Sequence, residues 1–205
     1  MILVSDTLVL NSLVSEKYLE TIKAFDGVVF HLAYHQSRLE ETLGHRSTVL
    51  KDILNPPKKG LYRCRVVYSE DSCEVNYIKY TKKNIESLKL IYDDSLEYSK
   101  KFENREALNT LLEKKESCDE ILLVKNGLIT DTTIANIALF DGEVWLTPKR
   151  PLLHGTCRAR LLDEGKIFAV DIKATELNRF KKIALMNAMI DFDIIATENI
   201  GEVIC

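Results

Sequence analysis

Apolar and polar residues alternate along the chain in a way that predicts short strands joined by tight turns, with helices between them. The apolar runs at 18–25 and 28–32 flank an Asp-Gly pair at 26–27, which is typical of a hairpin. Apolar residues then recur at helical intervals, which predicts an amphipathic helix over 32–43. Further strands are expected at 61–68, 73–80 and 88–93.

The second half of the chain continues this alternation of hairpins and helices. Asn-Gly at 126–127 and Asp-Gly at 141–142 lie between apolar runs, and each predicts a hairpin turn. Helices are expected at 105–115, 155–164 and 174–180, and strands at 120–125, 128–131, 136–141, 144–147, 166–172, 183–188 and 194–198. Hairpins with helices between them indicate an α+β fold in two domains.

A polar segment at 94–100 separates the two halves, and we interpret it as an interdomain linker. It divides the chain into a small N-terminal α/β domain at 1–93 and a larger C-terminal domain at 101–205. A chain of 205 residues is long enough for two small domains.

Composition narrows the class of protein. The chain is 46% hydrophobic and 29% charged, which is typical of a globular protein with a buried core. Its net charge of −3 argues against a nucleic-acid binder, although a local basic pocket for a phosphate stays open. No apolar run is long enough for a membrane helix, and the N-terminal residues lack a signal-peptide pattern. We therefore expect a cytoplasmic location and no membrane partner.

The five cysteines are scattered along the chain. None forms a Cys-x-x-Cys pair, and none has a zinc-type spacing with the four histidines. We expect all of them to be reduced thiols, and we expect no metal site.

Two segments could bind an anion. Gly155 precedes the helix expected at 155–164, and the free backbone N–H groups of Thr156 and Cys157 at its start would form an anion site. The alternative is a glycine that only serves a turn. Arg38, in the earlier helix, could bind a phosphate through two parallel hydrogen bonds. The alternative is a surface arginine.

Other charged residues could take part in chemistry. Lys101, next to Lys100, could act as a Schiff-base nucleophile if burial or a nearby cation activated it, or it could be a solvated charge. Asp131 ends an apolar strand, where a carboxylate is costly unless a cation or a donor meets it; the alternative is a turn aspartate. Arg63 and Arg65 lie on one strand face and could bind a substrate carboxylate or face solvent.

The order of these segments resembles that of the class IV aminotransferases. The shared segments are Leu-Glu-Thr-Ile at 19–22 with Asp-Gly at 26–27, His-x-x-Arg-Leu at 35–39, Lys-x-x-Asn-Arg at 101–105, Ala-Asn-Ile at 135–137 and Leu-x-Gly-Thr-x-Arg at 153–158. Within this family the chain is most similar to aminodeoxychorismate lyases and to short proteins related to them. The resemblance implies a two-domain fold with pyridoxal 5′-phosphate bound between the domains, in a homodimer.

The resemblance also implies a role for each matching residue. Lys101 would hold the cofactor as a Schiff base and move the proton, with Lys100 as the alternative one residue away. Asp131 would pair with the pyridinium nitrogen, a position at which the family commonly has glutamate. The phosphate would bind at Arg38, Thr156, Cys157 and Asn187, and the substrate at Thr21, Arg63 and Arg65.

The activity that the resemblance implies is that of a 4-amino-4-deoxychorismate lyase, which releases pyruvate and 4-aminobenzoate for folate biosynthesis. Transamination of branched-chain or D-amino acids uses the same lysine and stays open, as does a homologue that binds the cofactor without catalysis. The chain departs from the family on the substrate side. It lacks the glycine pair before Leu-Glu-Thr, and residues 68–71 replace the usual Arg-Gly stretch.

Overall fold

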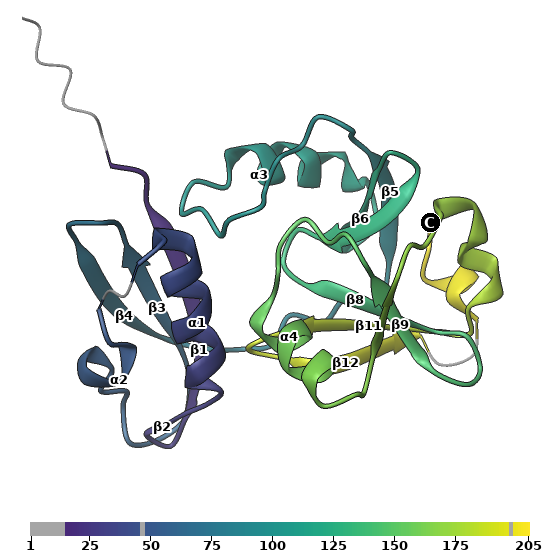
Figure 1. Ribbon diagram of the computed structural model, residues 1–205. Coiled ribbons are helices and arrows are strands. Elements are labelled where there is room, and N and C mark those ends of the chain that lie inside the picture. Colours follow the sequence, from purple (N-terminus) through teal and green to yellow (C-terminus); the bar gives the residue numbers. More distant parts are fainter. Residues whose placement is uncertain (1–14, 46–47, 197–198) are drawn as a thin grey trace, which may run out of the picture.

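A computed structural model describes residues 15–45, 48–196 and 199–205. The N-terminal residues in which we expect no signal peptide, and residues 197–198 of the strand predicted at 194–198, lie outside these ranges. In the described part, two bodies of secondary structure lie side by side (Figure 1), and the C-terminal body is the larger of the two.

The N-terminal body is an antiparallel sheet in the order β2-β1-β3-β4. Its elements are β1 (Tyr18–Phe25), β2 (Val28–Val29), β3 (Leu61–Tyr68), β4 (Cys73–Lys79), α1 (Leu32–Leu43) and α2 (Leu50–Ile53). Alternate residues of β1 and β3, such as Ile22 and Val66, are fully buried with Leu39 of α1. The hairpin prediction is confirmed, but β2 is short because the chain turns through His31, in a left-handed conformation, into α1.

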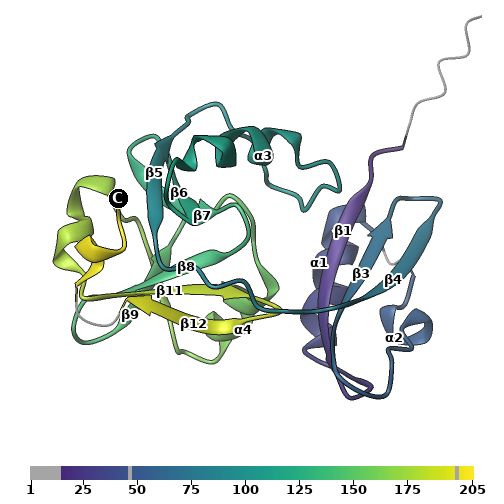
Figure 2. The ribbon, with the colours of Figure 1, turned by 180° about the vertical axis from the view of Figure 1, so that it is seen from behind.

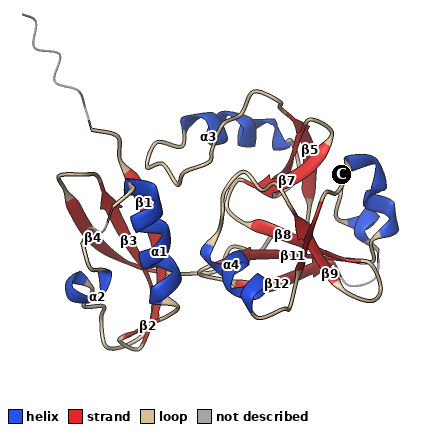
Figure 3. Cartoon of the chain, in the orientation of Figure 1, coloured by secondary structure: helices blue, strands red, loops and turns tan. Residues whose placement is uncertain are grey.

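The C-terminal body holds two sheets, in the orders β5-β6-β7 and β10-β9-β8-β11-β12. The strands are β5 (Leu88–Tyr92), β6 (Glu120–Lys125), β7 (Leu128–Thr132), β8 (Asn136–Phe140), β9 (Trp145–Pro148), β10 (Phe168–Val170), β11 (Lys182–Asn187) and β12 (Asp191–Ala196). The helices are α3 (Glu106–Leu112) and α4 (Thr156–Asp163), with 3₁₀ turns η1 (Glu113–Lys115), η2 (Ala174–Arg179) and η3 (Ile200–Glu202). Figure 3 shows the predominance of strands, and the predicted α+β class is confirmed. Among the described residues, no helix combines the length and apolarity that crossing a membrane requires.

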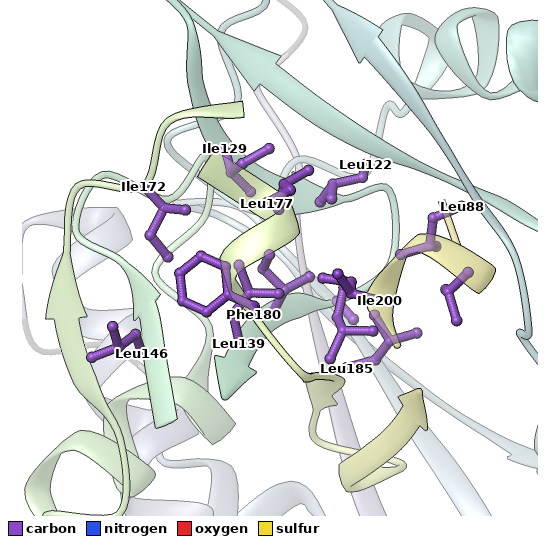
Figure 4. Close-up of a cluster of buried hydrophobic side chains, with 14 of the residues drawn as sticks. Leu88, Leu122, Ile129, Leu139, Leu146, Ile172, Leu177, Phe180, Leu185 and Ile200 are labelled. Atoms are coloured by element: carbon purple, nitrogen blue, oxygen red, sulfur yellow. The ribbon is translucent and has the colours of Figure 1, made fainter. Parts of the chain in front are cut away.

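The main apolar core lies between these two sheets. Leu122 and Ile129 of the three-stranded sheet belong to one buried cluster with Leu139 and Leu185 of the five-stranded sheet, and Phe180 closes it (Figure 4). Each such side chain stabilises the fold by roughly 1.5–3 kcal/mol through burial. The two sheets therefore form a well-packed scaffold that positions the loops extending from them.

The first strand of the three-stranded sheet precedes the predicted linker in sequence. β5 pairs in parallel with β6, with Leu88 opposite Glu120. The chain crosses from one body to the other between β4 and β5, as Figure 2 shows from behind. The linker at 94–100 stays a prediction, and the strand pairing leads us to propose a boundary between Lys79 and Leu88 instead.

A disulfide joins Cys118, just before β6, to Cys205. The expectation that all five cysteines are reduced is therefore wrong for this pair, whereas Cys64, Cys73 and Cys157 are free. The two partners are 87 positions apart, and they meet because Cys205 donates its backbone N–H to the carbonyl of Leu88, beside β6. No local sequence pattern reports such a contact.

Candidate active site

A cavity of about 410 Å³ lies between the two bodies. It is lined from the N-terminal body by β1, α1, β3 and β4, and from the C-terminal body by the segment before α3, the β7–β8 loop, the start of α4 and the β11–β12 turn. Seven of the predicted site residues line it: Thr21, Arg38, Arg63, Lys101, Asp131, Thr156 and Asn187. The other two, Arg65 and Cys157, do not.

Lys101 is held at the cavity wall by its own backbone, whose carbonyl accepts a hydrogen bond from the Leu19 N–H at 2.8 Å. Burial lowers the pKa of Lys101 to about 7, and the nearby Arg38 guanidinium adds to this effect. A large fraction of the amine is therefore unprotonated near neutrality, which is the state that attacks a carbonyl carbon. Lys100 instead donates from Nζ to the carbonyl of Thr42 at 3.1 Å, and it does not line the cavity.

Asp131 also lines the cavity, at 4% exposure on β7. Its Oδ1 accepts from Nδ2 of Asn136 at 2.8 Å and its Oδ2 from the Leu153 N–H at 2.9 Å. Burial raises the pKa of Asp131 to about 6, although both donors oppose the rise. Nδ2 of Asn136 also donates to the Leu153 carbonyl at 2.8 Å, so this amide joins Asp131 to the loop before α4.

Gly155 is required by a close approach and not by its backbone angles. Its φ of −71° is ordinary for any residue. A Cβ at this position would lie 1.9 Å from Oδ1 of Asn136. A side chain would therefore displace the amide that holds Asp131, and this gives the glycine a role within the protein wall in addition to the predicted approach of a ligand.

Helix α4 begins at Thr156 on the cavity wall, and no side chain among the described residues caps its first turn. Its first N–H groups lack partners within the helix, and the helix dipole favours an anion at this end. The Cys157 side chain turns elsewhere, since its Sγ donates to the carbonyl of Asp191 at 3.3 Å. Burial raises the pKa of this thiol to about 12, so the predicted contribution of Cys157 rests on its backbone N–H.

Arg38 is held by a buried acid that we had not assigned to the site. Its Nε donates to Oε1 of Glu20 at 2.7 Å and its Nη2 to Oε2 at 2.6 Å, while Nδ1 of His35 lies 2.6 Å from Oε2. Burial alone would raise the pKa of Glu20, but Arg38 and His35 together lower it to about 2. The sequence signal was present: a carboxylate at a buried position of a strand needs a cationic partner.

The two arginines of β3 have different environments. Arg65 pairs with Glu103, Nη2 to Oε1, at 2.8 Å and lies outside the cavity lining, so its role in substrate binding stays a prediction. Arg63 lines the cavity, and its buried Nε has no hydrogen-bond partner among the described residues. Asn187 also lines the cavity, although its Oδ1 is engaged by the Met189 N–H of the β11–β12 turn at 2.9 Å.

Several cavity residues lay outside the prediction. Tyr98 and Arg105 come from the segment before α3, and Nη2 of Arg105 donates to the carbonyl of Thr133 at 2.6 Å. Tyr80 comes from the crossing between β4 and β5. Arg105 ends the Lys-x-x-Asn-Arg segment and could have been found there, whereas only the path of the chain brings Tyr80 to the cavity.

The family of the chain follows from comparison with known proteins. Residues 101–195 match the model of the amino-transferase class IV family. An uncharacterized protein of Haemophilus influenzae is 34% identical over 180 residues, which cover 83% of this chain and 96% of that protein. A crystal structure from Haemophilus somnus 129pt, provisionally named a 4-amino-4-deoxychorismate lyase, has 35% identity and a TM-score of 0.80 over 85% of this chain and 96% of that one. The chain belongs to the class IV aminotransferase family, as predicted.

A more distant structure shares the fold. The PLP-bound form of a hypothetical aminotransferase from Mycobacterium tuberculosis has a TM-score of 0.70 at 16% identity, over 89% of this chain and 81% of that one. The family comprises aminotransferases and lyases whose members bind pyridoxal phosphate.

Proposed function

We propose that this chain binds pyridoxal 5′-phosphate in the cavity and acts as a 4-amino-4-deoxychorismate lyase. The observation that carries the proposal is the convergence of Lys101, with a pKa of about 7, and the buried Asp131 on one cavity beside the start of α4. The name of the Haemophilus somnus relative supports the lyase as the reaction.

The cavity residues fit the cofactor by their chemistry. An amine with a pKa of about 7 suits the aldehyde, and a buried carboxyl suits a protonated ring nitrogen. The first turn of α4 and Arg38 suit a phosphate, with Glu20 fixing the guanidinium. The cavity volume of about 410 Å³ is also within the usual range for a small-molecule site.

The residues of the chain would divide the work as follows. Bound pyridoxal phosphate would supply an electron sink for the carbanion formed on the substrate. Lys101 would accept and return the proton at Nζ, for which a pKa near 7 is well suited. Asp131 would keep the ring nitrogen protonated, and Asn136 with the Leu153 N–H would hold Asp131 in place. Helix α4 and Arg38 would orient the phosphate.

The predicted homodimer and cytoplasmic location stay proposals. We infer a dimer because the family resemblance implies one. Sedimentation of the purified chain tests it: a mass near twice 23.4 kDa supports the dimer, and a mass of one chain contradicts it.

The decisive test of the cofactor is borohydride reduction of the protein after addition of pyridoxal phosphate, followed by peptide mapping. Borohydride fixes pyridoxal as a stable secondary amine on the lysine that held it. We expect the modification on Lys101, with Lys100→Ala still modified and Lys101→Ala unmodified. Modification of Lys100 would shift the register by one residue, and absence of any modified lysine would overturn the proposal.

The reaction is tested separately with the loaded protein. Release of pyruvate from 4-amino-4-deoxychorismate supports the lyase. If amino acids instead convert the bound cofactor to its pyridoxamine form and no pyruvate appears, the lyase proposal is wrong and transamination replaces it.

A further inference from the structure

Arg63 differs from the other cations around the cavity because its buried donor is unsatisfied. Nε of Arg63 has no hydrogen-bond partner in the part of the chain that the structure describes, although the residue lines the cavity. A buried donor without an acceptor destabilises the protein, because the group has lost water and gained nothing in exchange. An anion that reaches this guanidinium from the cavity would supply an acceptor.

The other two arginines of the cavity wall, and Lys83, already have partners. Arg38 is bound by Glu20, Nη2 of Arg105 donates to a backbone carbonyl, and Nζ of Lys83 donates to the carbonyl of Asp119 at 3.0 Å. Lys101 is assigned to the cofactor in the proposed function. Arg63 is therefore the guanidinium that the cavity offers to a second ligand group.

The positive charge of the cavity wall also favours an anionic ligand. Six basic residues line the cavity, namely Arg38, Arg63, Lys79, Lys83, Lys101 and Arg105, and among the described residues Asp131 is the one acid on the wall. A phosphate at the start of α4 would neutralise part of this positive charge. Arg63 belongs to another element, β3, where it pairs across the sheet with Ile78 of β4. A guanidinium beside an exposed isoleucine, 39% exposed, suits a carboxylate carried on an apolar ring.

We propose that Arg63 binds a substrate carboxylate that is remote from the reacting amine, and that it thereby selects ring amino acids with such a carboxylate over those without one. The inference rests on the proposed function, because it assigns the substrate class of the same site. Arg65 is not assigned this task, because it does not line the cavity and its Nη2 donates to Glu103.

The test compares two ligands that differ in one charge, 4-aminobenzoate and 4-aminobenzamide, by calorimetric titration into the cofactor-loaded protein. We expect the carboxylate to bind at least about tenfold more tightly than the amide, as a charged hydrogen bond predicts. Arg63→Met should bring the ratio of the two dissociation constants close to one. Lys23→Met removes a positive charge directly opposite Arg63 in the sheet but outside the cavity lining, and it should leave the ratio within about twofold of wild type.

Three further measurements keep the result interpretable. Circular dichroism establishes that each variant folds. If Arg63→Met does not fold, Arg63→Gln repeats the test with a neutral polar side chain. Arg63→Lys should retain part of the preference, because it keeps the charge and loses the planar fork. A wild-type ratio in both neutral Arg63 variants, or an equal loss in Lys23→Met, would overturn the assignment.

The two proposals fail in different ways. If borohydride finds no cofactor on Lys101, the proposed function fails, and the same titration on the cofactor-free protein still decides whether Arg63 recognises a ring carboxylate. If Lys101 carries the cofactor and Arg63→Met keeps the preference for the carboxylate, only the inference about Arg63 fails.

Discussion

The two sides of the cavity are built in different ways. On the C-terminal side, Asp131 is held by neutral donors, and Gly155 leaves room for the Asn136 amide that provides one of them. On the N-terminal side, Arg38 is held by the buried Glu20, whereas Arg63 has an unsatisfied donor. Satisfied polar groups such as Asp131 and Arg38 suit a resident cofactor, and the free donor of Arg63 suits a ligand that binds and leaves.

The family match covers the C-terminal side of the cavity more fully than the N-terminal side. The family model covers residues 101–195, which belong to the C-terminal side of the cavity. The departures from the family pattern, before Leu-Glu-Thr and at 68–71, belong to the N-terminal side. We propose that the C-terminal side supplies most of the cofactor contacts, with Arg38 added from the N-terminal side, and that substrate choice depends mainly on the N-terminal side.

The largest expected effect is that of replacing Lys101, on which both the cofactor and the reaction depend. Lys101→Ala should lower the rate of pyruvate release by roughly 10³-fold or more, because it removes the cofactor attachment and the proton carrier together. Lys100→Ala is the matched control and should stay near wild type. Equal losses in both variants would mean that the pair acts through charge and not through one reactive amine.

Breaking the buried ion pair should show how much the N-terminal side depends on it. Glu20→Gln leaves Arg38 without its charged partner and should destabilise the protein by about 3 kcal/mol, measured by urea unfolding. Glu103→Gln breaks the more exposed pair with Arg65 and should cost less than about 1 kcal/mol. Similar values for the two variants would contradict the difference in burial on which the comparison depends.

Gly155→Ala sharpens the description of the C-terminal side. The added Cβ would collide with Oδ1 of Asn136, and we expect a loss of about 1–3 kcal/mol in stability together with weaker cofactor binding. The clash should be relieved in the Asn136→Ala background, where Gly155→Ala should cost much less. Additive effects of the two substitutions in a double-mutant cycle would show that this contact is not the cause.

Cofactor loading should depend on pH through Lys101. Below its pKa of about 7 the amine is protonated and cannot attack the aldehyde, so the loading rate should rise about tenfold per pH unit below 7 and level off above it. The rate is read from the absorbance of the cofactor after mixing. A rise that continues to pH 10 would mean that burial does not lower this pKa.

The same lowered pKa affects stability in a defined direction. Because the folded state binds this proton more weakly than the unfolded chain, stability should fall as pH decreases from about 10.5 to about 7. Asp131 has a raised pKa of about 6, so its contribution should fall as pH increases from about 3.8 to about 6. Urea unfolding at several pH values measures both slopes. In Lys101→Met the dependence of the unfolding free energy on pH between about 7 and 10.5 should be lost, and in Asp131→Asn the dependence between about 3.8 and 6 should be lost.

Local patterns predicted most of the elements of the described chain. The Asp-Gly and Asn-Gly turns, the helical spacing over 32–43 and the alternating strands correspond to hairpins and helices in the structure. The positions of Lys101 and Asp131 on one cavity were expected only through the order of motifs along the chain. Turns, helices and strands depend on contacts between residues that are close in sequence, and these contacts produce periodic patterns of apolar residues. The elements could therefore be predicted from the sequence.

The amino-acid sequence by itself determined the order of most elements and the family, and it suggested the residues that we propose for the chemistry. Only the tertiary structure decided that β5 joins the C-terminal sheet, that Cys118 meets Cys205, that Glu20 takes Arg38 and that Glu103 takes Arg65. These outcomes depend on pairings between distant residues, which compete with one another and with water for the same charged groups. The partner that each charge finds is decided by which side chains the folded backbone brings within hydrogen-bonding distance.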